Sequence, residues 1–138
     1  MSTAQHLLLI GGLINILTSV LVGYALFWTR VHDPKRRTLS GLVSHKITLW
    51  NGFLLFSLAV AIEHTGFTPQ VNNLLAIAEV VISILAGVRS MIIWARGIGN
   101  IFRQDSPFLM RSVGIGHMVD LLVVAGIFYG VARTVFGI

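Results

Sequence analysis

The sequence predicts an all-α protein, a four-helix transmembrane bundle. Of its 138 residues, 55% are hydrophobic and only 11% are charged, whereas soluble domains have roughly 25% charged residues. Four long apolar runs are present, and at about 20 residues per membrane crossing they use nearly the whole chain. We therefore expect a single integral membrane domain, residues 1–138, with no room for a soluble domain.

The apolar runs place the spans at about 6–28, 42–62, 71–94 and 108–133. The first lacks a basic leader and a cleavage site, and three equally apolar runs follow it, so we interpret it as a retained span. Gly11, Gly12 and Gly23 in this span would let a neighbouring helix approach closely. Pro107 stands where a helix start tolerates proline. Because the loops are short, consecutive spans should be antiparallel neighbours.

The basic residues indicate the orientation in the membrane. The first and third loops carry Arg30, Lys35, Arg36, Arg37, Arg96 and Arg103, whereas the second loop and the N-terminus carry no Lys or Arg. The positive-inside rule therefore predicts both termini on the non-cytoplasmic side. The net charge of +5 is then explained by topology and anionic lipid headgroups rather than by nucleic acid. We expect the location to be a bacterial inner (cytoplasmic) membrane.

Several kinds of chemistry are excluded by composition and motif. Cysteine is absent, which rules out disulfides, thiolate catalysis and iron–sulfur clusters. Phosphate-binding glycine loops, nucleophile elbows and HExxH patterns are also absent. The residues to explain are therefore the polar side chains inside the spans, since hydrocarbon offers no water to replace their hydrogen bonds.

Ionisable residues in the third and fourth spans form one candidate group. The helical rise places Arg89, His117 and Asp120 at similar depth in the cytoplasmic half of the membrane. An Arg89–Asp120 ion pair with His117 beside it is geometrically reasonable, because His117 and Asp120 share a helix face. Such a group can be a structural clamp or part of a site, and both interpretations stay open. Glu79 lies about 15 Å from Arg89 along the span, too far for a direct ion pair. It must therefore find a partner on another helix, be protonated, or face water.

His45 has the best placement for cofactor chemistry. It stands at the membrane edge of the second span, where an imidazole is a natural axial ligand for haem iron. A lone histidine at a helix start is also commonly an interfacial side chain. His45 alone does not decide between these two interpretations.

A longer pattern around His45 resembles the styrene oxide isomerase family. The resemblance rests on His45, Asn51-Gly52, a long apolar run, Gly66-Phe67 and Leu74-Leu75. It covers roughly residues 6–81, while the third and fourth spans match only in hydropathy and length. Members of that family are small four-span membrane enzymes that assemble as trimers and hold haem b between subunits. They convert aryl epoxides to aldehydes by a Lewis-acid rearrangement.

This resemblance implies roles for individual residues. His45 corresponds to the axial ligand of haem b, and Asn51 to the residue that hydrogen-bonds the epoxide oxygen. The six-residue spacing rotates Asn51 about 120° from His45, so the two would line sites at two subunit interfaces. The family carries a span-three tyrosine that positions the epoxide, and Ser90 falls closest to that position here. Neighbouring Arg89 introduces a charge that could bind a haem propionate.

The leading hypothesis is therefore a haem-b-binding homo-oligomer, a trimer if it follows the family, that isomerises small apolar epoxides. An apolar wall of Trp50, Phe53 and Phe56 would shield the reacting substrate, although these rings are also ordinary packing residues. One alternative is a non-catalytic accessory subunit of a larger membrane complex. Another is a proton or ion pathway that uses the ionisable residues of the third and fourth spans.

Overall fold

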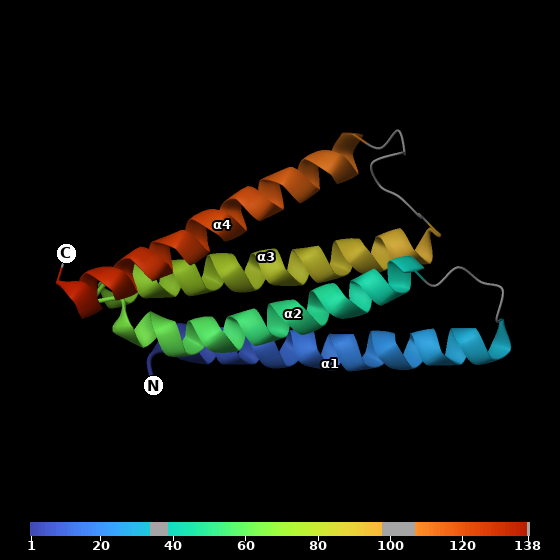
Figure 1. The fold of residues 1–138 in the computed structure, drawn as a ribbon, viewed down its shortest axis with the longest axis horizontal. Helices are drawn as coiled ribbons and strands as arrows, with labels where there is room; N and C mark the ends of the chain where they lie inside the picture. Colours follow the sequence, from blue (N-terminus) through green and yellow to red (C-terminus); the bar gives the residue numbers. More distant parts are fainter. Residues whose placement is uncertain (34–38, 98–106, 138) are drawn as a thin grey trace.

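The computed structural model describes residues 1–33, 39–97 and 107–137. These residues form four long helices, α1 (Thr3–His32), α2 (Leu39–Ala61), α3 (Pro69–Ala95) and α4 (Pro107–Phe136) (Figure 1). A short 3-10 helix, η1 (Ile62–His64), follows α2 directly. All four long helices are long and apolar enough to cross a membrane. The predicted fold class, an all-α four-helix membrane bundle, is confirmed at this level.

The helices extend past most ends of the predicted spans, because caps rather than hydropathy decide where a helix begins. The Ser2 side chain caps α1 by accepting a hydrogen bond from the Gln5 backbone N–H at 3.2 Å. Thr68 caps α3 in the same way, with Pro69 in its first turn. α4 begins at Pro107, as the sequence predicts. The apolar run therefore locates each span, and local chemistry sets its ends.

Consecutive helices are antiparallel neighbours, as expected from the short loops. Both termini lie at the same end of the bundle (Figure 1), which we call the terminal end; the other is the loop end. Which side of the membrane the terminal end faces stays a prediction. The basic residues Lys35, Arg36, Arg37 and Arg103, on which that prediction rests in part, lie outside the described residues.

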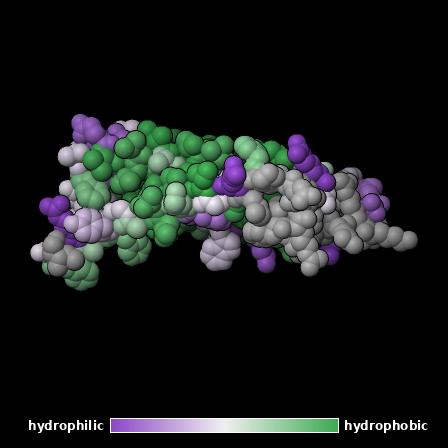
Figure 2. Space-filling view, turned by 90° about the horizontal axis from the view of Figure 1, so that it is seen from above, coloured by the Kyte–Doolittle hydropathy of each residue, from purple (hydrophilic) through white to green (hydrophobic). Residues whose placement is uncertain are grey.

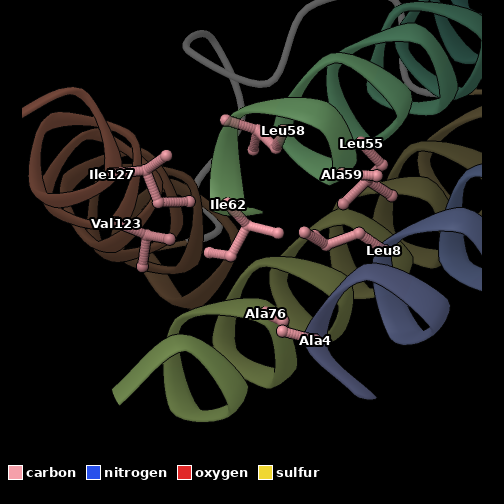
Figure 3. Close-up of a cluster of buried hydrophobic side chains, with 9 residues drawn as sticks. All are labelled: Ala4, Leu8, Leu55, Leu58, Ala59, Ile62, Ala76, Val123 and Ile127. Carbon is pink, nitrogen blue, oxygen red and sulfur yellow. The ribbon is translucent and has the colours of Figure 1, made fainter. Parts of the chain in front are cut away.

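The apolar core lies near the terminal end, where all four helices meet. Its side chains come from α1, α2, η1, α3 and α4 and converge in the space between these elements (Figure 3). They are Ala4, Leu8, Leu55, Leu58, Ala59, Ile62, Ala76, Val123 and Ile127. Toward the loop end, α4 diverges from α3 (Figure 1). In an apolar 18-residue stretch of α4 only 17% of the residues are buried, against 33% in such a stretch of α1 and of α2.

Glycines allow α1 and α2 to touch at backbone level. A Cβ placed on Gly12 would lie 3.2 Å from the Gly52 carbonyl oxygen, and a Cβ on Gly52 would lie 3.2 Å from that of Gly12. A Cβ on Gly11 would meet Val80 of α3 at 2.7 Å. The predicted role of small residues is confirmed for Gly11 and Gly12, because their missing side chains make room for neighbouring helices.

The turn between α2 and α3 anchors the terminal end of α4. Gly66 has φ +67°, a left-handed conformation that glycine adopts without strain. The ring of Phe67 fills the space that a side chain on Gly130 would need, since a Cβ there would lie 2.7 Å from Phe67 Cε2. Gly66-Phe67, one part of the sequence resemblance, is thus a packing element in this fold.

On the face shown in Figure 2, apolar side chains cover much of the coloured surface, and hydrophilic ones are frequent at its left-hand end. At the loop end, three rings line up on the exposed face of α1. Tyr24 stacks on Trp28 with centroids 6.3 Å apart, and Trp28 lies 4.4 Å from His32. Aromatic side chains of this kind concentrate at the headgroup level of a bilayer.

Candidate functional site

His45 lies on α2 against α1, with its ring partly buried. Its Nδ1 is 2.8 Å from the Ser19 carbonyl oxygen and 2.9 Å from the Ser19 hydroxyl oxygen. The same hydroxyl donates to the His45 carbonyl oxygen at 2.9 Å. Ser19 therefore holds both the backbone and the imidazole of His45.

This geometry selects one tautomer of the neutral imidazole. A backbone carbonyl oxygen only accepts hydrogen bonds, so the Nδ1 atom that contacts it must carry the proton. The Ser19 hydroxyl proton is used on the His45 carbonyl oxygen, so the hydroxyl oxygen also accepts from Nδ1. The lone pair of the neutral ring is consequently on Nε2, the atom available to a metal ion.

Gly23 makes the space in which the imidazole lies. A Cβ on Gly23 would be 3.2 Å from His45 Cε1 and 3.3 Å from Nδ1, closer than ordinary van der Waals contact. Any side chain at this position would push the ring away from Ser19. The role of Gly23 is therefore to admit an imidazole rather than a helix backbone.

Asn51 faces the other side of α2 and contacts α3. Its amide nitrogen donates to the Ser83 carbonyl oxygen at 3.3 Å, which is long for an N–H···O bond. The Ser83 hydroxyl accepts from Asn15 of α1 at 3.2 Å. Three helices thus meet at one polar contact, and His45 and Asn51 do not share a pocket within one protomer.

Ser90 lies in the interface between α2 and α3, where 6% of its surface is exposed. Its hydroxyl donates to the Gly87 carbonyl oxygen at 2.7 Å and contacts the Ser44 hydroxyl at 2.9 Å. Ser44 itself is completely buried. The Ser90 hydroxyl is fully used by the protein, and a tyrosine at this position would overfill the interface.

Arg89 joins α3 to α4 across the divergent part of the bundle. Its Nη1 donates to the Ser112 carbonyl oxygen at 3.0 Å. A Cβ on Gly116 would lie 3.6 Å from Nη1, so this glycine lies beside the guanidinium. Arg89 is on the α4 side of α3, away from the α1–α2 contact that holds His45.

The expected Arg89–Asp120 ion pair is not formed. Asp120 instead neighbours the Glu79 carboxyl group, while Arg89 bonds Ser112, about 12 Å nearer the start of α4. Counting residues from the helix ends predicts which side chains lie at equal depth only when the two helix axes are aligned. The axis of α4 is inclined to that of α3 (Figure 1). The fold thus gives Glu79 a neighbour on another helix, α4.

The other residues singled out in the sequence lie on the outer surface or between helices. His117 is exposed on α4. Trp50 and Phe53 are 70% and 51% exposed on α2, whereas Phe56 packs on Gly12 of α1. The three rings therefore do not form a common wall within one protomer.

A hollow of about 140 Å³ lies at the terminal end, lined by Ser2, Thr3, Ala4, Glu63, Phe67, Pro69, Asn72 and Asn73. It is smaller than the roughly 300–1,000 Å³ of typical cofactor pockets. Ala4 and Gly23 are about 30 Å apart along α1, so this hollow is not part of the His45 environment.

Sequence reasoning missed the small uncharged polar residues that surround the candidate residues. Asn15, Ser19 and Ser83 are almost fully buried, and each bonds a neighbouring helix. The available signal was their spacing, because Asn15, Ser19 and Gly23 recur at intervals of four and so share one face of α1.

No protein-family model, curated protein or solved structure matches this chain. The resemblance to styrene oxide isomerase accordingly rests on the residues between positions 6 and 81 alone.

Proposed function

We propose that this chain is an integral membrane protein that binds haem b through Nε2 of His45. The observation that carries the proposal is the pair of contacts between His45 Nδ1 and Ser19, at 2.8 and 2.9 Å. Metal-ligating histidines almost always donate their second ring N–H to a carbonyl, carboxylate or water. The chain thus supplies an oriented imidazole with its lone pair on the second nitrogen.

The surroundings of His45 suit a cofactor shared between copies of the chain. The ring is partly exposed at the α1–α2 surface, with apolar Val20, Phe27 and Leu42 also exposed on these helices. A flat cofactor bound there needs a second apolar wall, which another copy can supply. A homo-oligomer, a trimer if the chain follows the family it resembles, meets this requirement.

Arg89 is the proposed partner of a haem propionate. The guanidinium has five N–H donors, and the contact with Ser112 occupies Nη1. Because Arg89 faces α4 while His45 faces α1, the propionate contact falls to a neighbouring copy. Asn51 faces α3 and not α1, so it too would contact a haem that is held by His45 of a neighbouring copy.

Conversion of aryl epoxides to aldehydes is the finer part of the proposal. Ferric haem, when bound, supplies a Lewis acid for the epoxide oxygen. The long contact of Asn51 with Ser83 leaves its amide weakly held, so it can turn to orient that oxygen. Ser90 is less suited to a substrate contact, because its hydroxyl is buried and already bonded to Gly87 and Ser44.

The first experiment is the absorption spectrum of the full-length protein purified after expression with added haem. Wild type should show a Soret band, and His45→Ala should lose it. His64→Ala is the matched control, since His64 is exposed at the terminal end and should leave the band intact. An unchanged band in His45→Ala would overturn the assignment. A wild type without haem favours the accessory-subunit alternative.

The second experiment tests the proposed tautomer without any cofactor. Nitrogen-15 NMR of haem-free protein with labelled histidine should show His45 protonated on Nδ1. Ser19→Ala removes the hydroxyl but keeps the carbonyl, so the tautomer should persist with a changed Nδ1 shift. Protonation of Nε2 in wild type would contradict the geometry on which the proposal rests.

The third experiment addresses the chemistry. Haem-loaded wild type should convert styrene oxide to the aldehyde faster than haem-free protein does. Asn51→Ala should keep the Soret band and slow turnover about five- to 150-fold, as expected for one hydrogen bond worth roughly 1–3 kcal/mol. Equal rates with and without haem would rule out this activity for styrene oxide.

A further inference from the structure

Glu79 is an acidic residue buried in the middle of a membrane-spanning helix, α3. Its side chain is 1% exposed, and its Oε2 has no hydrogen-bond partner among the described residues. Glu79 and Asp120 each lie at least about 15 Å along the axis from either end of their helices. Water at the two membrane surfaces therefore does not reach this pair directly.

Among the described residues, no Lys or Arg lies near the pair on any of the packed helices. Between His6 and Arg30, α1 has no charged residue, and α2 has none between Lys46 and Glu63. On α3, Arg89 is about 15 Å away along the axis and bonds Ser112. On α4, His117 is one turn from Asp120 and is exposed. The charged neighbour of the Glu79 carboxyl group is therefore the carboxyl group of Asp120.

Two facing carboxylates without a counter-charge are unfavourable in an apolar interior, because both are desolvated and they repel each other. One proton bound between the two carboxylates replaces their repulsion by a hydrogen bond. The protonated carboxyl then donates a hydrogen bond to the other, as in paired carboxylates that share a proton. Such a bond would use the acceptor capacity that Glu79 Oε2 leaves unfilled.

We propose that Glu79 and Asp120 form a membrane-embedded proton-binding site that holds α4 against α3. The proton is the ligand, and the two carboxyl groups are its receptors. Asp120, which is only partly buried, is the more accessible of the two carboxyl groups. This proposal is independent of His45 and of haem, because the pair lies between α3 and α4.

A protonated carboxyl in an apolar site has a diagnostic reaction with dicyclohexylcarbodiimide. The carboxyl oxygen adds to the central carbon of the reagent while the carboxyl proton transfers to one of its nitrogens, giving an O-acylisourea with no leaving group. An ionised carboxylate lacks the proton for this addition. An apolar carbodiimide partitions into the membrane, whereas a water-soluble one does not.

The experiment treats the full-length wild type in liposomes at neutral pH with dicyclohexylcarbodiimide and locates the adduct by peptide mass spectrometry. We expect modification of Glu79 or Asp120 at least tenfold above that of Glu63, which is exposed at the terminal end and accepts hydrogen bonds from Ser2. The water-soluble carbodiimide should not reproduce this labelling. Absence of modification at both Glu79 and Asp120 in wild type would overturn the proposal, and this result requires no variant to fold.

Infrared spectroscopy provides a second measurement. Wild type should show the C=O band of a protonated carboxyl group with a deuterium shift. Glu79→Gln keeps the side-chain shape and lets the new amide donate to Asp120, so the band should disappear while the helices remain. Glu63→Gln is the matched control and should retain the band. An identical band in Glu79→Gln and wild type would show that the shared proton is not at this site.

Discussion

The contact between α1 and α2 and the contact between α3 and α4 are built in different ways. α1 and α2 meet through Gly12 and Gly52, whose missing side chains let backbone atoms touch. α3 and α4 meet closely only near the terminal end and then diverge (Figure 1). Beyond that point they are connected by polar side chains, through Glu79 with Asp120 and Arg89 with Ser112.

This difference follows from how helices associate in lipid. Lipid tails are as apolar as leucine, so helix association depends on close packing and on hydrogen bonds rather than on the hydrophobic effect. The α1–α2 contact uses close packing, and the α3–α4 contact relies more on hydrogen bonds. Close packing cannot be separated without losing many contacts together, whereas a polar contact can be removed singly. We therefore expect α4 to be the more easily displaced helix.

Gly52→Ala should have the largest effect on stability. Its Cβ would meet Ile16 Cγ1 at 2.6 Å and the Gly12 carbonyl oxygen at 3.2 Å, and the backbone oxygen has little freedom to move. We expect a loss of about 1–3 kcal/mol, typical of overpacking. Gly114→Ala is the matched control, because a Cβ there meets nothing within 4 Å; it should be neutral or gain up to about 1 kcal/mol from helix propensity. Thermal unfolding in detergent measures both, and equal stabilities would show that the glycine contact is unimportant.

Arg89→Ala should have a smaller and more local effect. Loss of the bond to the Ser112 carbonyl should cost about 1 kcal/mol, in the range of polar contacts between membrane helices. Hydrogen exchange should rise in the loop-end half of α4 and stay unchanged in α1. Arg133→Ala, an exposed arginine at the terminal end of α4, is the control and should leave exchange in that half unchanged. Equal acceleration in α1 and α4 would contradict a separable α3–α4 contact.

The hydroxyl contact between Ser44 and Ser90 should have the smallest effect. A double-mutant cycle with Ser44→Ala and Ser90→Ala should give a coupling energy of about 0.6 kcal/mol, the average for hydrogen bonds inside a membrane protein. Each alanine keeps the small volume that the α2–α3 interface requires. A coupling above about 2 kcal/mol would mean that hydrogen bonds also dominate the contact between the closely packed helices α2 and α3. The proposed difference between this contact and the α3–α4 contact would then be wrong.

The positions of the helices could be predicted from the sequence, but most partners of their polar side chains could not. Apolar runs and proline locate spans because these depend on local composition. Partners depend on the rotation and tilt of each helix, which is why Asp120 faces Glu79 rather than Arg89. Ser19 was overlooked because a single serine scarcely changes the hydropathy of a span. His45 can be singled out from the sequence because an imidazole at the edge of a span is a natural axial ligand for haem iron, yet its orientation required the structure.

The aromatic column of Tyr24, Trp28 and His32 also indicates how deeply the bundle lies in the bilayer. If Trp28 is at the headgroup level, then Gly23 and the imidazole above it lie about 8 Å toward the membrane centre. At that depth one edge of a ligand on His45 Nε2 would be in hydrocarbon, while charged groups on its other edge could extend to interfacial water. The column therefore favours an amphipathic ligand with its charges on one side, and thicker or thinner bilayers would change how well such a ligand is accommodated.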